Sequence, residues 1–375
     1  TNLNTVPAKI STLTNLESLN LSNNTISQNF SNLSNLINLR ELNLSGNQLT
    51  KIPSEIASLS ALVSLDLSIN LFLSNYATVL GNLQNLEWLS LANNQITAFP
   101  AELSQLKKLV HLNFSGNKIA GGFESLLTLT ELEQIYLDKN EISGVFPSSL
   151  LQLEKLQMLS LTGNQLSGEI PENLPAITFL ENNRFTKQEI KNFILKNKEL
   201  ADFTYSPQRY DEPKNVYATL GSSTSLTQAL SGNEYQFSWY KNLDQKVPGT
   251  FESYYISNVE DDDFALYTCE AYVFEELPNE LMEISFFREP VTLVKELGTE
   301  EIKNDLVVYP NPTTDFLYIK TSKLDLEKVF IFDLSGKLLF SEKSKTIDVR
   351  NLPSATYIIS IKTSATLKSF KFIKH

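Results

Sequence analysis

The 375-residue sequence predicts a mainly β protein in which a repeat solenoid is followed by two small β-sandwich domains. Three observations support this fold class. A pattern of leucine and asparagine recurs at a nearly constant period up to about residue 204, strand-like runs without that period follow, and the charge changes in steps along the chain. Residues 201–295 hold 16 acidic and 6 basic side chains, whereas residues 296–375 hold 10 acidic and 12 basic ones.

The repeat follows the template L-x-x-L-x-x-L-x-L-x-x-N-x-L through seven consecutive units. Its asparagines are 23 or 24 residues apart: Asn24, Asn47, Asn70, Asn94, Asn117, Asn140 and Asn164. In the L-x-L segment the leucines point inward from a short strand, and the residues between them face solvent. One unit cannot bury its own apolar face, but stacked units share a continuous core. We expect the asparagine amide to satisfy backbone groups in the buried turn after the strand.

The second half of several units contains an apolar residue followed by proline, as at Ile170-Pro171. This pattern resembles the plant-type leucine-rich-repeat family, which implies short helical or extended turns on the convex side. Residues 1–13 fit the second half of the template, so we expect the sequence to begin inside a repeat of a longer protein. A shortened last unit around Asn183 ends the solenoid within residues 1–204, and residues 187–194 have the pattern of an amphipathic capping helix.

Residues 205–295 contain landmarks of a second domain. Trp239 lies in a strand-like run, and Tyr267 and Cys269 end the segment D-F-A-L-Y-T-C. These residues resemble the buried tryptophan, the tyrosine corner and the second cysteine of an immunoglobulin-like sandwich. That family has its first cysteine near the position of Leu226, and this chain has none there. Cys269 is the only cysteine, so no internal disulfide can form, and we expect it to be a buried small hydrophobe.

The last domain, residues 307–375, follows an acidic and polar linker at residues 296–306. It contains three ordered motifs and a closing strand that alternates basic and apolar residues. The motifs are Tyr309-Pro310-Asn311-Pro312, then Asp333-Leu334-Ser335-Gly336-Lys337, then Leu352-Pro353 with Tyr357. Their order resembles the C-terminal sorting domain of the type IX secretion system of the Bacteroidota.

This resemblance implies passage through the periplasm, recognition of the domain at the outer membrane, and export to the cell surface or the medium. The domain is often cleaved afterwards in that family. Ala355 stands where the family usually has glycine, and it would strain the turn if that position needed a positive φ. The alternative interpretation is a sandwich that serves only as a stalk.

Little in the sequence indicates catalysis. Its two histidines are His111 and His375, and it contains neither a G-x-S-x-G nucleophile elbow nor a G-x-x-x-x-G-K phosphate loop. The run 261–263 of three aspartates lacks the alternating spacing of a calcium loop, and we expect it to cap the turn before the Tyr267 strand. We therefore expect no enzyme activity, no cofactor and no metal.

The net charge of −12 disfavours nucleic acid as a partner. The sequence contains no run of 18 apolar residues, so it predicts no membrane span.

The outward-facing strand positions form rows along the solenoid, because neighbouring strands lie about 4.8 Å apart. These positions are mostly small and polar in the first three repeats. Repeats four to seven instead bring together larger side chains on the concave face: Trp88, His111, Gln134, Tyr136, Asp138 and Met158. Tryptophan and tyrosine are favoured anchors at interfaces, so we predict that these six residues bind the ligand. The alternatives are ordinary surface variation, or packing against another copy or domain.

Together these features predict a secreted or surface-displayed binding protein with an adhesin-like role, exported by the type IX system. The expected partners are an extracellular protein or glycan and the secretion machinery. Two alternatives remain. The chain could be the targeting part of a secreted enzyme whose catalytic domain lies upstream, or a structural spacer.

Overall fold

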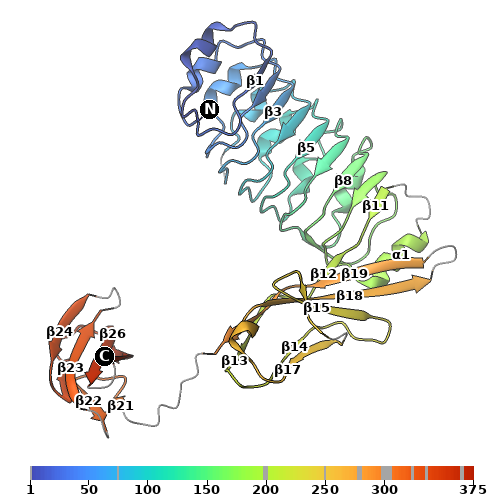
Figure 1. Cartoon of the computed structure of the whole chain (residues 1–375). Coiled ribbons are helices and arrows are strands. Elements are labelled where there is room, and N and C mark those ends of the chain that lie inside the picture. Colours follow the sequence, from blue (N-terminus) through green and yellow to red (C-terminus); the bar gives the residue numbers. More distant parts are fainter. Residues whose placement is uncertain are drawn as a thin grey trace. The chain divides into compact units, whose positions relative to one another are not determined.

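The computed structural model describes residues 2–73, 76–196, 202–248, 251–276, 281–296, 306–321, 325–333, 337–363 and 367–375 (Figure 1). The chain divides into two compact units. The first comprises Thr1–Val216 with Ser223–Val294, and the second comprises Tyr217–Ser222 with Lys295–His375. The repeats and the middle β domain belong to the first unit, and the C-terminal β domain belongs to the second.

The repeats form a parallel sheet of nine short strands within the described residues. These strands are β1 (Ser18–Asn20), β2 (Glu41–Asn43), β3 (Ser64–Asp66), β4 (Trp88–Ser90), β5 (His111–Asn113), β6 (Gln134–Tyr136), β8 (Met158–Ser160), β10 (Ile177–Phe179) and β11 (Asp202–Thr204). Each pairs with the next in register, so the central residue of one strand lies beside that of its neighbour, as Leu65 does beside Leu89. The predicted solenoid of stacked L-x-L strands is confirmed.

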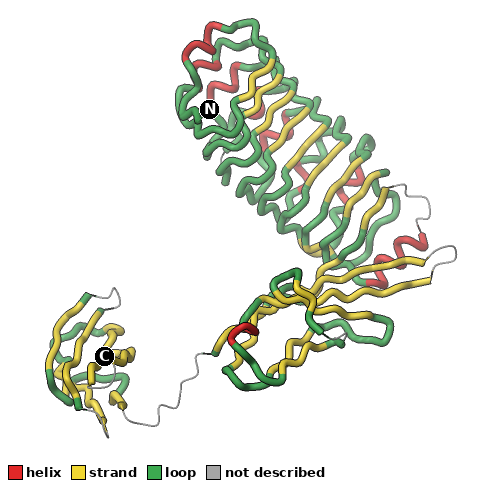
Figure 2. Tube along the Cα trace, viewed as in Figure 1, coloured by secondary structure: helices red, strands yellow, loops and turns green. Residues whose placement is uncertain are grey.

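Short 3-10 helices lie on the other side of each repeat, as predicted for the convex turns (Figure 2). They are η1 (Ala8–Thr12), η2 (Phe30–Leu33), η3 (Ser54–Ser58), η4 (Leu80–Asn82), η5 (Ala101–Gln105), η6 (Phe123–Ser125) and η7 (Ser148–Gln152). Proline directly precedes η1, η3, η5 and η7, where its fixed φ suits a helix start and no amide donor is needed. A small extra ladder pairs β7 (Ser143–Gly144) with β9 (Gln165–Leu166).

The template asparagines form a ladder through the core, which confirms their predicted role. Asn117 is typical. Its Oδ1 accepts the backbone N–H of Ile96 in the preceding repeat at 3.0 Å, and its Nδ2 donates to the carbonyls of Leu91 at 3.0 Å and Phe114 at 2.9 Å. The side chain is buried, so backbone groups that would otherwise be orphaned in the turn are satisfied by neutral amides.

The ladder ends at a glutamine. Gln208 is fully buried, and its Oε1 accepts the N–H of Phe185 at 3.1 Å while its Nε2 donates to the carbonyl of Leu180 at 2.9 Å. It therefore makes the bonds that an asparagine makes in each repeat. Helix α1 (Lys187–Lys196) buries Ile190 and Phe193, which confirms the predicted capping helix.

The middle β domain begins at that same glutamine. Its elements are β12 (Gln208–Tyr210), β13 (Lys214–Ala218), β14 (Thr224–Thr227), β15 (Gln236–Lys241), β16 (Gln245–Lys246), β17 (Ser253–Ile256), η8 (Asp261–Asp263), β18 (Leu266–Glu276), β19 (Leu281–Arg288) and β20 (Val291–Lys295). The main sheet has the order β12-β19-β18-β15-β16, β20 pairs with both β18 and β13, and β14 pairs with β17. Because β12 follows β11 after three residues, the solenoid runs directly into this domain.

The core of the middle domain contains the residues that the sequence singled out. Trp239 on β15 pairs with Cys269 on β18, and both are buried. Burial raises the pKa of the Cys269 thiol to about 12, which agrees with the expected role of a small apolar side chain. The hydroxyl of Tyr267 donates to the carbonyl of Asp263 at 2.9 Å, and that aspartate caps η8 by accepting the N–H of Glu260 at 3.0 Å.

The second unit contains two antiparallel sheets, of order β21-β22-β25 and β24-β23-β26-β27. The strands are β21 (Leu306–Tyr309), β22 (Phe316–Thr321), β23 (Leu326–Phe332), β24 (Leu338–Glu342), β25 (Thr346–Asp348), β26 (Ala355–Thr363) and β27 (Leu367–Lys374). Their inward residues, among them Leu317, Ile331 and Ile359, form one core. Ala355 opens β26 outside the left-handed region, so the strain considered for it does not arise. Residues 334–336 of the predicted motif and most of the linker lie outside the described residues.

Candidate functional site

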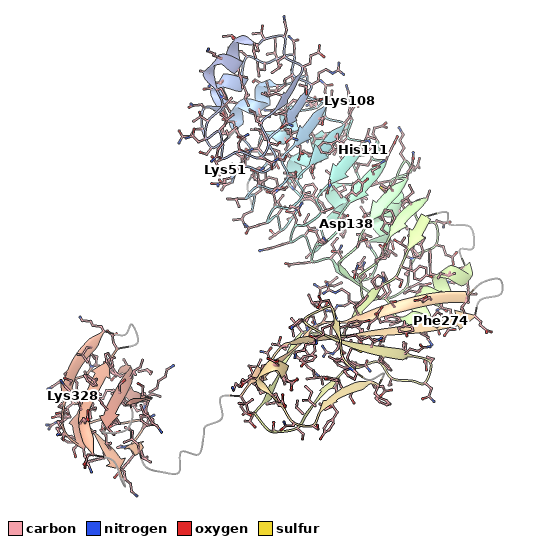
Figure 3. The ribbon with its side chains drawn as sticks, in the orientation of Figure 1. Lys51, Lys108, His111, Asp138, Phe274 and Lys328 are labelled. Carbon is pink, nitrogen blue, oxygen red and sulfur yellow. The ribbon has the colours of Figure 1, made fainter. Side chains whose placement is uncertain are left out.

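We call the outward side chains of β1–β6, β8 and β10, together with those of the two residues that follow each strand, the strand face. Parallel register aligns Trp88, His111, Gln134 and Met158 in one row, and it places Tyr136 in the next row. All five side chains are half-buried. The Tyr136 hydroxyl donates to Gln134 Oε1 at 3.0 Å, which fixes both side chains on β6. Figure 3 labels His111 and Asp138 among the side chains of this part of the solenoid.

Asp138 follows β6 and is held by three donors. Its Oδ1 accepts the hydroxyl of Ser160 and, at 3.1 Å, the backbone N–H of Thr162, while its Oδ2 accepts the hydroxyl of Ser115 at 3.1 Å. One repeat further along, the Thr162 hydroxyl donates to Glu181 Oε2 at 2.8 Å. Hydrogen bonds across neighbouring repeats therefore orient both carboxylates, and none of these donors carries a positive charge.

Two hollows lie on the strand face and divide the predicted site. The first, of about 350 Å³, is lined by Ser18, Leu19, Asn20, Glu41, Leu42, Asn43, Ser64, Asp66 and Trp88. The second, of about 540 Å³, is lined by Asn93, Ser115, Gly116, Asp138, Lys139, Ser160, Thr162, Phe179 and Glu181. Trp88 thus belongs to the first hollow and Asp138 to the second. The other four predicted residues lie on β5, β6 and β8, outside both linings.

Sequence reasoning missed the part of the strand face that β10 contributes. Register places Ile177 beside Met158 and Phe179 beside Ser160, and Glu181 then follows the strand as Asp138 follows β6. Ile177 and Phe179 are half-buried and outward-facing. The last unit is only 19 residues long, counted from Asn164 to Asn183, so its strand falls outside the regular period. Alignment on the L-x-x-N segment of that unit, Leu180 to Asn183, would have revealed these residues.

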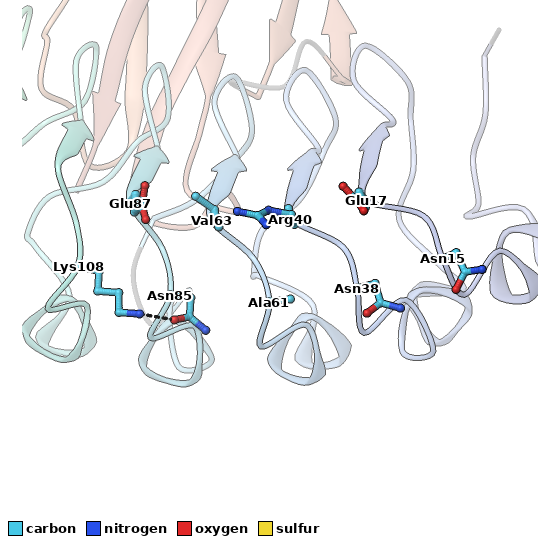
Figure 4. A pocket seen from close by; sticks show the side chains of 9 residues that line it. All are labelled: Asn15, Glu17, Asn38, Arg40, Ala61, Val63, Asn85, Glu87 and Lys108. Atoms are coloured by element: carbon cyan, nitrogen blue, oxygen red, sulfur yellow. Dashed lines mark hydrogen bonds between the residues drawn. The ribbon is translucent and has the colours of Figure 1, made fainter.

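A separate groove of about 610 Å³ follows the edge where the strands begin (Figure 4). Its lining is mainly polar: Asn15, Glu17, Asn38, Arg40, Ala61, Val63, Asn85, Glu87 and Lys108. Lys108 donates to Asn85 Oδ1 at 2.7 Å, and Asn38 donates to the carbonyl of Thr14 at 3.0 Å. The groove contains no aromatic side chain, so it offers a weaker anchor for a partner than the strand face does.

Within the described ranges, no group of three or more histidine, cysteine, aspartate or glutamate side chains is arranged to hold a metal ion. Among the same residues, no helix combines the length and apolar character needed to cross a bilayer.

Comparison with known families identifies two parts of the chain. The family described as secretion system C-terminal sorting domain matches residues 307–375. Leucine-rich-repeat families match residues 61–119, and also 38–59 and 155–177. The chain therefore contains leucine-rich repeats, a class of domain associated with protein binding, and a C-terminal sorting domain of the kind used for type IX secretion. A search among curated proteins found no match.

Three solved structures are similar to about half of the chain. A leucine-rich-repeat protein of Leptospira interrogans is 33% identical with a TM-score of 0.48, covering 54% of this chain and 52% of its own. An internalin of Listeria monocytogenes is 27% identical with a TM-score of 0.48, covering 54% and 58%. The ectodomain of a membrane receptor kinase from Arabidopsis thaliana is 30% identical with a TM-score of 0.43, covering 56% and 29%. The chain thus spans about half, or less, of the length of these proteins.

Proposed function

We propose that this chain is a secreted or surface-displayed, adhesin-like binding protein that recognises an extracellular partner with the strand face of its solenoid. The observation that carries the proposal is the continuous row of large, half-buried side chains Trp88, His111, Gln134 and Met158, with Tyr136 beside it. Aromatic side chains that are partly exposed on a rigid sheet are pre-organised anchors, because little conformational entropy is lost when they are covered.

The hollow that holds Asp138 belongs to the same proposed surface. No catalytic residues form part of the proposal. A binding module and a spacer would both have a stable solenoid, but a spacer has no need of exposed aromatic side chains. The second candidate function is that this chain is the targeting part of a longer secreted enzyme, whose catalytic domain lies elsewhere in that protein.

The middle β domain is proposed to be immunoglobulin-like. Three features support this: buried Trp239 directly opposite Cys269, the hydrogen bond from Tyr267 back to Asp263, and Leu226, fully buried on β14, in the region expected for the missing first cysteine.

Export through the type IX system of a member of the Bacteroidota is the proposed route to the cell surface or medium, since the sorting-domain match covers residues 307–375. Deleting residues 306–375 should leave the remainder in the periplasm of a host with that system. Normal secretion of the shortened chain would contradict this route.

The binding proposal is tested by screening the whole chain against arrays of extracellular proteins and glycans, then repeating each positive measurement with the Trp88→Ala/Tyr136→Ala variant. We expect at least about tenfold weaker binding, since aromatic anchors at interfaces typically contribute more than 1 kcal/mol each. Leu13→Ala/Ile37→Ala removes two exposed apolar side chains outside the strand face and serves as the matched control. Equal binding by the wild type and the Trp88/Tyr136 variant would show that the site is wrong.

A further inference from the structure

The charge on the strand face is one-sided. It comprises eight five-residue segments, each running from the first strand residue to the second residue after the strand: 18–22, 41–45, 64–68, 88–92, 111–115, 134–138, 158–162 and 177–181. These segments contain Glu41, Asp66, Asp138 and Glu181 but no lysine or arginine. The chain has 31 lysines and arginines in total, and none of them lies in these segments; Lys139 follows directly after Asp138.

These four carboxylates are divided equally between the two hollows, and each pair lies with an aromatic ring. Glu41 and Asp66 line the first hollow with Trp88, and Asp138 and Glu181 line the second with Phe179. None of the four forms an ion pair among the described residues. Lys139, which lines the second hollow, is exposed.

Neutral hydroxyl groups hold the carboxylates in place. Ser18 donates to Glu41 Oε2 at 2.9 Å, Ser68 donates to Asp66 Oδ1 at 2.7 Å, and Thr162 donates to Glu181 Oε2 at 2.8 Å. These donors are neutral, so their bonds restrict the side-chain rotamers without neutralising the negative charges. An aromatic face beside two fixed carboxylates is the environment that attracts an ammonium or guanidinium group, through ion pairing and cation–π contact together.

We propose that each hollow binds a basic side chain of one extended polypeptide, so that the partner of the strand face is a protein segment with two separated lysine or arginine residues. This inference rests on the proposed function and specifies its ligand. The carboxylates of the first hollow lie on β2 and β3, and those of the second follow β6 and β10. At about 4.8 Å per strand, the two hollows are about 20 Å apart.

This distance decides what kind of ligand can occupy both hollows. An extended chain advances about 3.3 Å per residue, so two basic residues about six positions apart reach both hollows at once. Apolar residues between them would lie over the outward side chains of β5 and β6, which are His111, Gln134 and Tyr136. A single small amine occupies only one hollow, so it lacks the gain in affinity that comes from linking two sites.

The experiment compares two synthetic peptides of identical composition on the full chain. In one, two arginines are separated by five residues that include a central leucine, and in the other the two arginines are adjacent. We expect the separated pair to bind about tenfold more tightly in a fluorescence anisotropy titration at low salt, and to lose affinity as sodium chloride is added. Equal affinities for the two peptides, or no binding of either, would overturn the proposal.

Two variants with equal charge changes locate the binding. Glu41→Gln/Asp66→Asn/Asp138→Asn/Glu181→Gln neutralises the two hollows, and Glu55→Gln/Glu102→Gln/Glu124→Gln/Glu154→Gln neutralises four carboxylates on or beside η3, η5, η6 and η7. The first variant should bind the separated-arginine peptide about tenfold more weakly, and the second should bind it as the wild type does. Similar losses in both would mean that the peptide responds only to net charge, which contradicts the proposal.

Folding and ligand source are controlled in the same series. Asn43 lies one strand before Asp66 at the equivalent position and makes the same bond to a serine N–H, so Asp66→Asn fits the turn. If the fourfold variant has a lowered melting temperature, the double variant Glu41→Gln/Glu181→Gln should still bind the separated-arginine peptide more weakly than the wild type does. Spermine tests whether a free amine is the ligand. If spermine displaces the peptide with an affinity equal to that of the peptide, the ligand of the strand face is a polyamine and the proposal of a polypeptide is wrong. A screened ligand that requires Trp88 but ignores salt and all four carboxylates would leave the proposed function standing and refute this inference.

Discussion

The solenoid and the middle β domain bury polar groups in opposite ways. In the solenoid, each repeat buries one neutral amide whose bonds to backbone are the same from repeat to repeat, as for Asn47 and Asn117. The middle domain instead buries a charge, Arg288, whose side chain is 2% exposed. Its Nε lies 3.2 Å from Asp211 Oδ2 and donates to the carbonyl of Thr227 at 3.0 Å, and a second guanidinium nitrogen donates to the carbonyl of Glu289.

The difference shows where each region is vulnerable. A neutral amide has a modest desolvation cost, so repeating it along the core adds no large penalty at any point. A buried guanidinium costs more to desolvate and depends on its partners; burial lowers the pKa of Arg288, and Asp211 opposes that shift. The solenoid therefore distributes neutral polar groups over many repeats, whereas the middle domain also buries two charged side chains, Arg288 and Glu289, each in an ion pair.

The sharpest test of this contrast is Arg288→Ala. It leaves the Asp211 carboxylate beside an empty volume and removes the donors from the carbonyls of Thr227 and Glu289, so we expect a loss of about 3–5 kcal/mol in unfolding free energy. Chemical denaturation followed by Trp239 fluorescence would report it. The double variant Arg288→Met/Asp211→Asn removes both charges and should recover a large part of the loss. A double variant no more stable than Arg288→Ala would show that packing, not charge, dominates.

A smaller loss is expected from Asn117→Ala in the middle of the ladder. This change leaves the buried N–H of Ile96 without its partner, which should cost about 1–3 kcal/mol, whereas the carbonyls of Leu91 and Phe114 keep the bonds that Asn94 and Asn140 donate to them. Asn24→Ala is the matched control, because Asn24 is only part-buried and water can replace its bonds. Equal losses in the two variants, measured by thermal melting, would contradict the view that burial determines how much each ladder asparagine contributes to the free energy of unfolding.

The same contrast explains what the sequence could predict. In the solenoid each strand pairs with the next one in the chain, so a period of 23 or 24 residues was enough to place the strands, the convex helices and the ladder. In the middle domain, β12 pairs with β19 and β13 pairs with β20, over separations that no local pattern encodes. Its landmarks Trp239 and Tyr267 were recognisable, but β12, β13, β16, β19 and β20 were not predicted.

The candidate site was predictable only as far as the period held. The rows through Trp88 and Met158 followed from counting, because parallel register carries each outward position to the next strand. Phe179 and Glu181 were missed because the last unit is short. The first hollow was missed for a different reason: Glu41 and Asp66 are unremarkable one by one, and only their position beside Trp88 in space gives them significance. The substitution of Gln208 for a ladder asparagine was likewise invisible, since the spacing changes there.

The smallest effect is expected at the surface where the solenoid's capping helix meets the middle domain. Glu275 on β18 accepts bonds from Lys191 and, at 2.9 Å, from Lys187, both on α1, and these hydrogen bonds lower the pKa of the Glu275 carboxyl below its ordinary 4.5. A lowered carboxyl pKa stabilises the fold above pH 4.5, and that contribution disappears as the pH falls through the lowered value. Glu275→Gln should therefore cost less than about 1 kcal/mol at pH 7, because ion pairs near the surface contribute little, and this cost should shrink as the pH falls through the lowered pKa. The control for charge alone is Glu276→Gln, at an exposed neighbouring position.

A loss of melting temperature that is the same at pH 3 and pH 7 would show that Glu275 acts through packing. In that case, the solenoid and the middle domain are joined mainly by Gln208 and by the apolar core beneath α1.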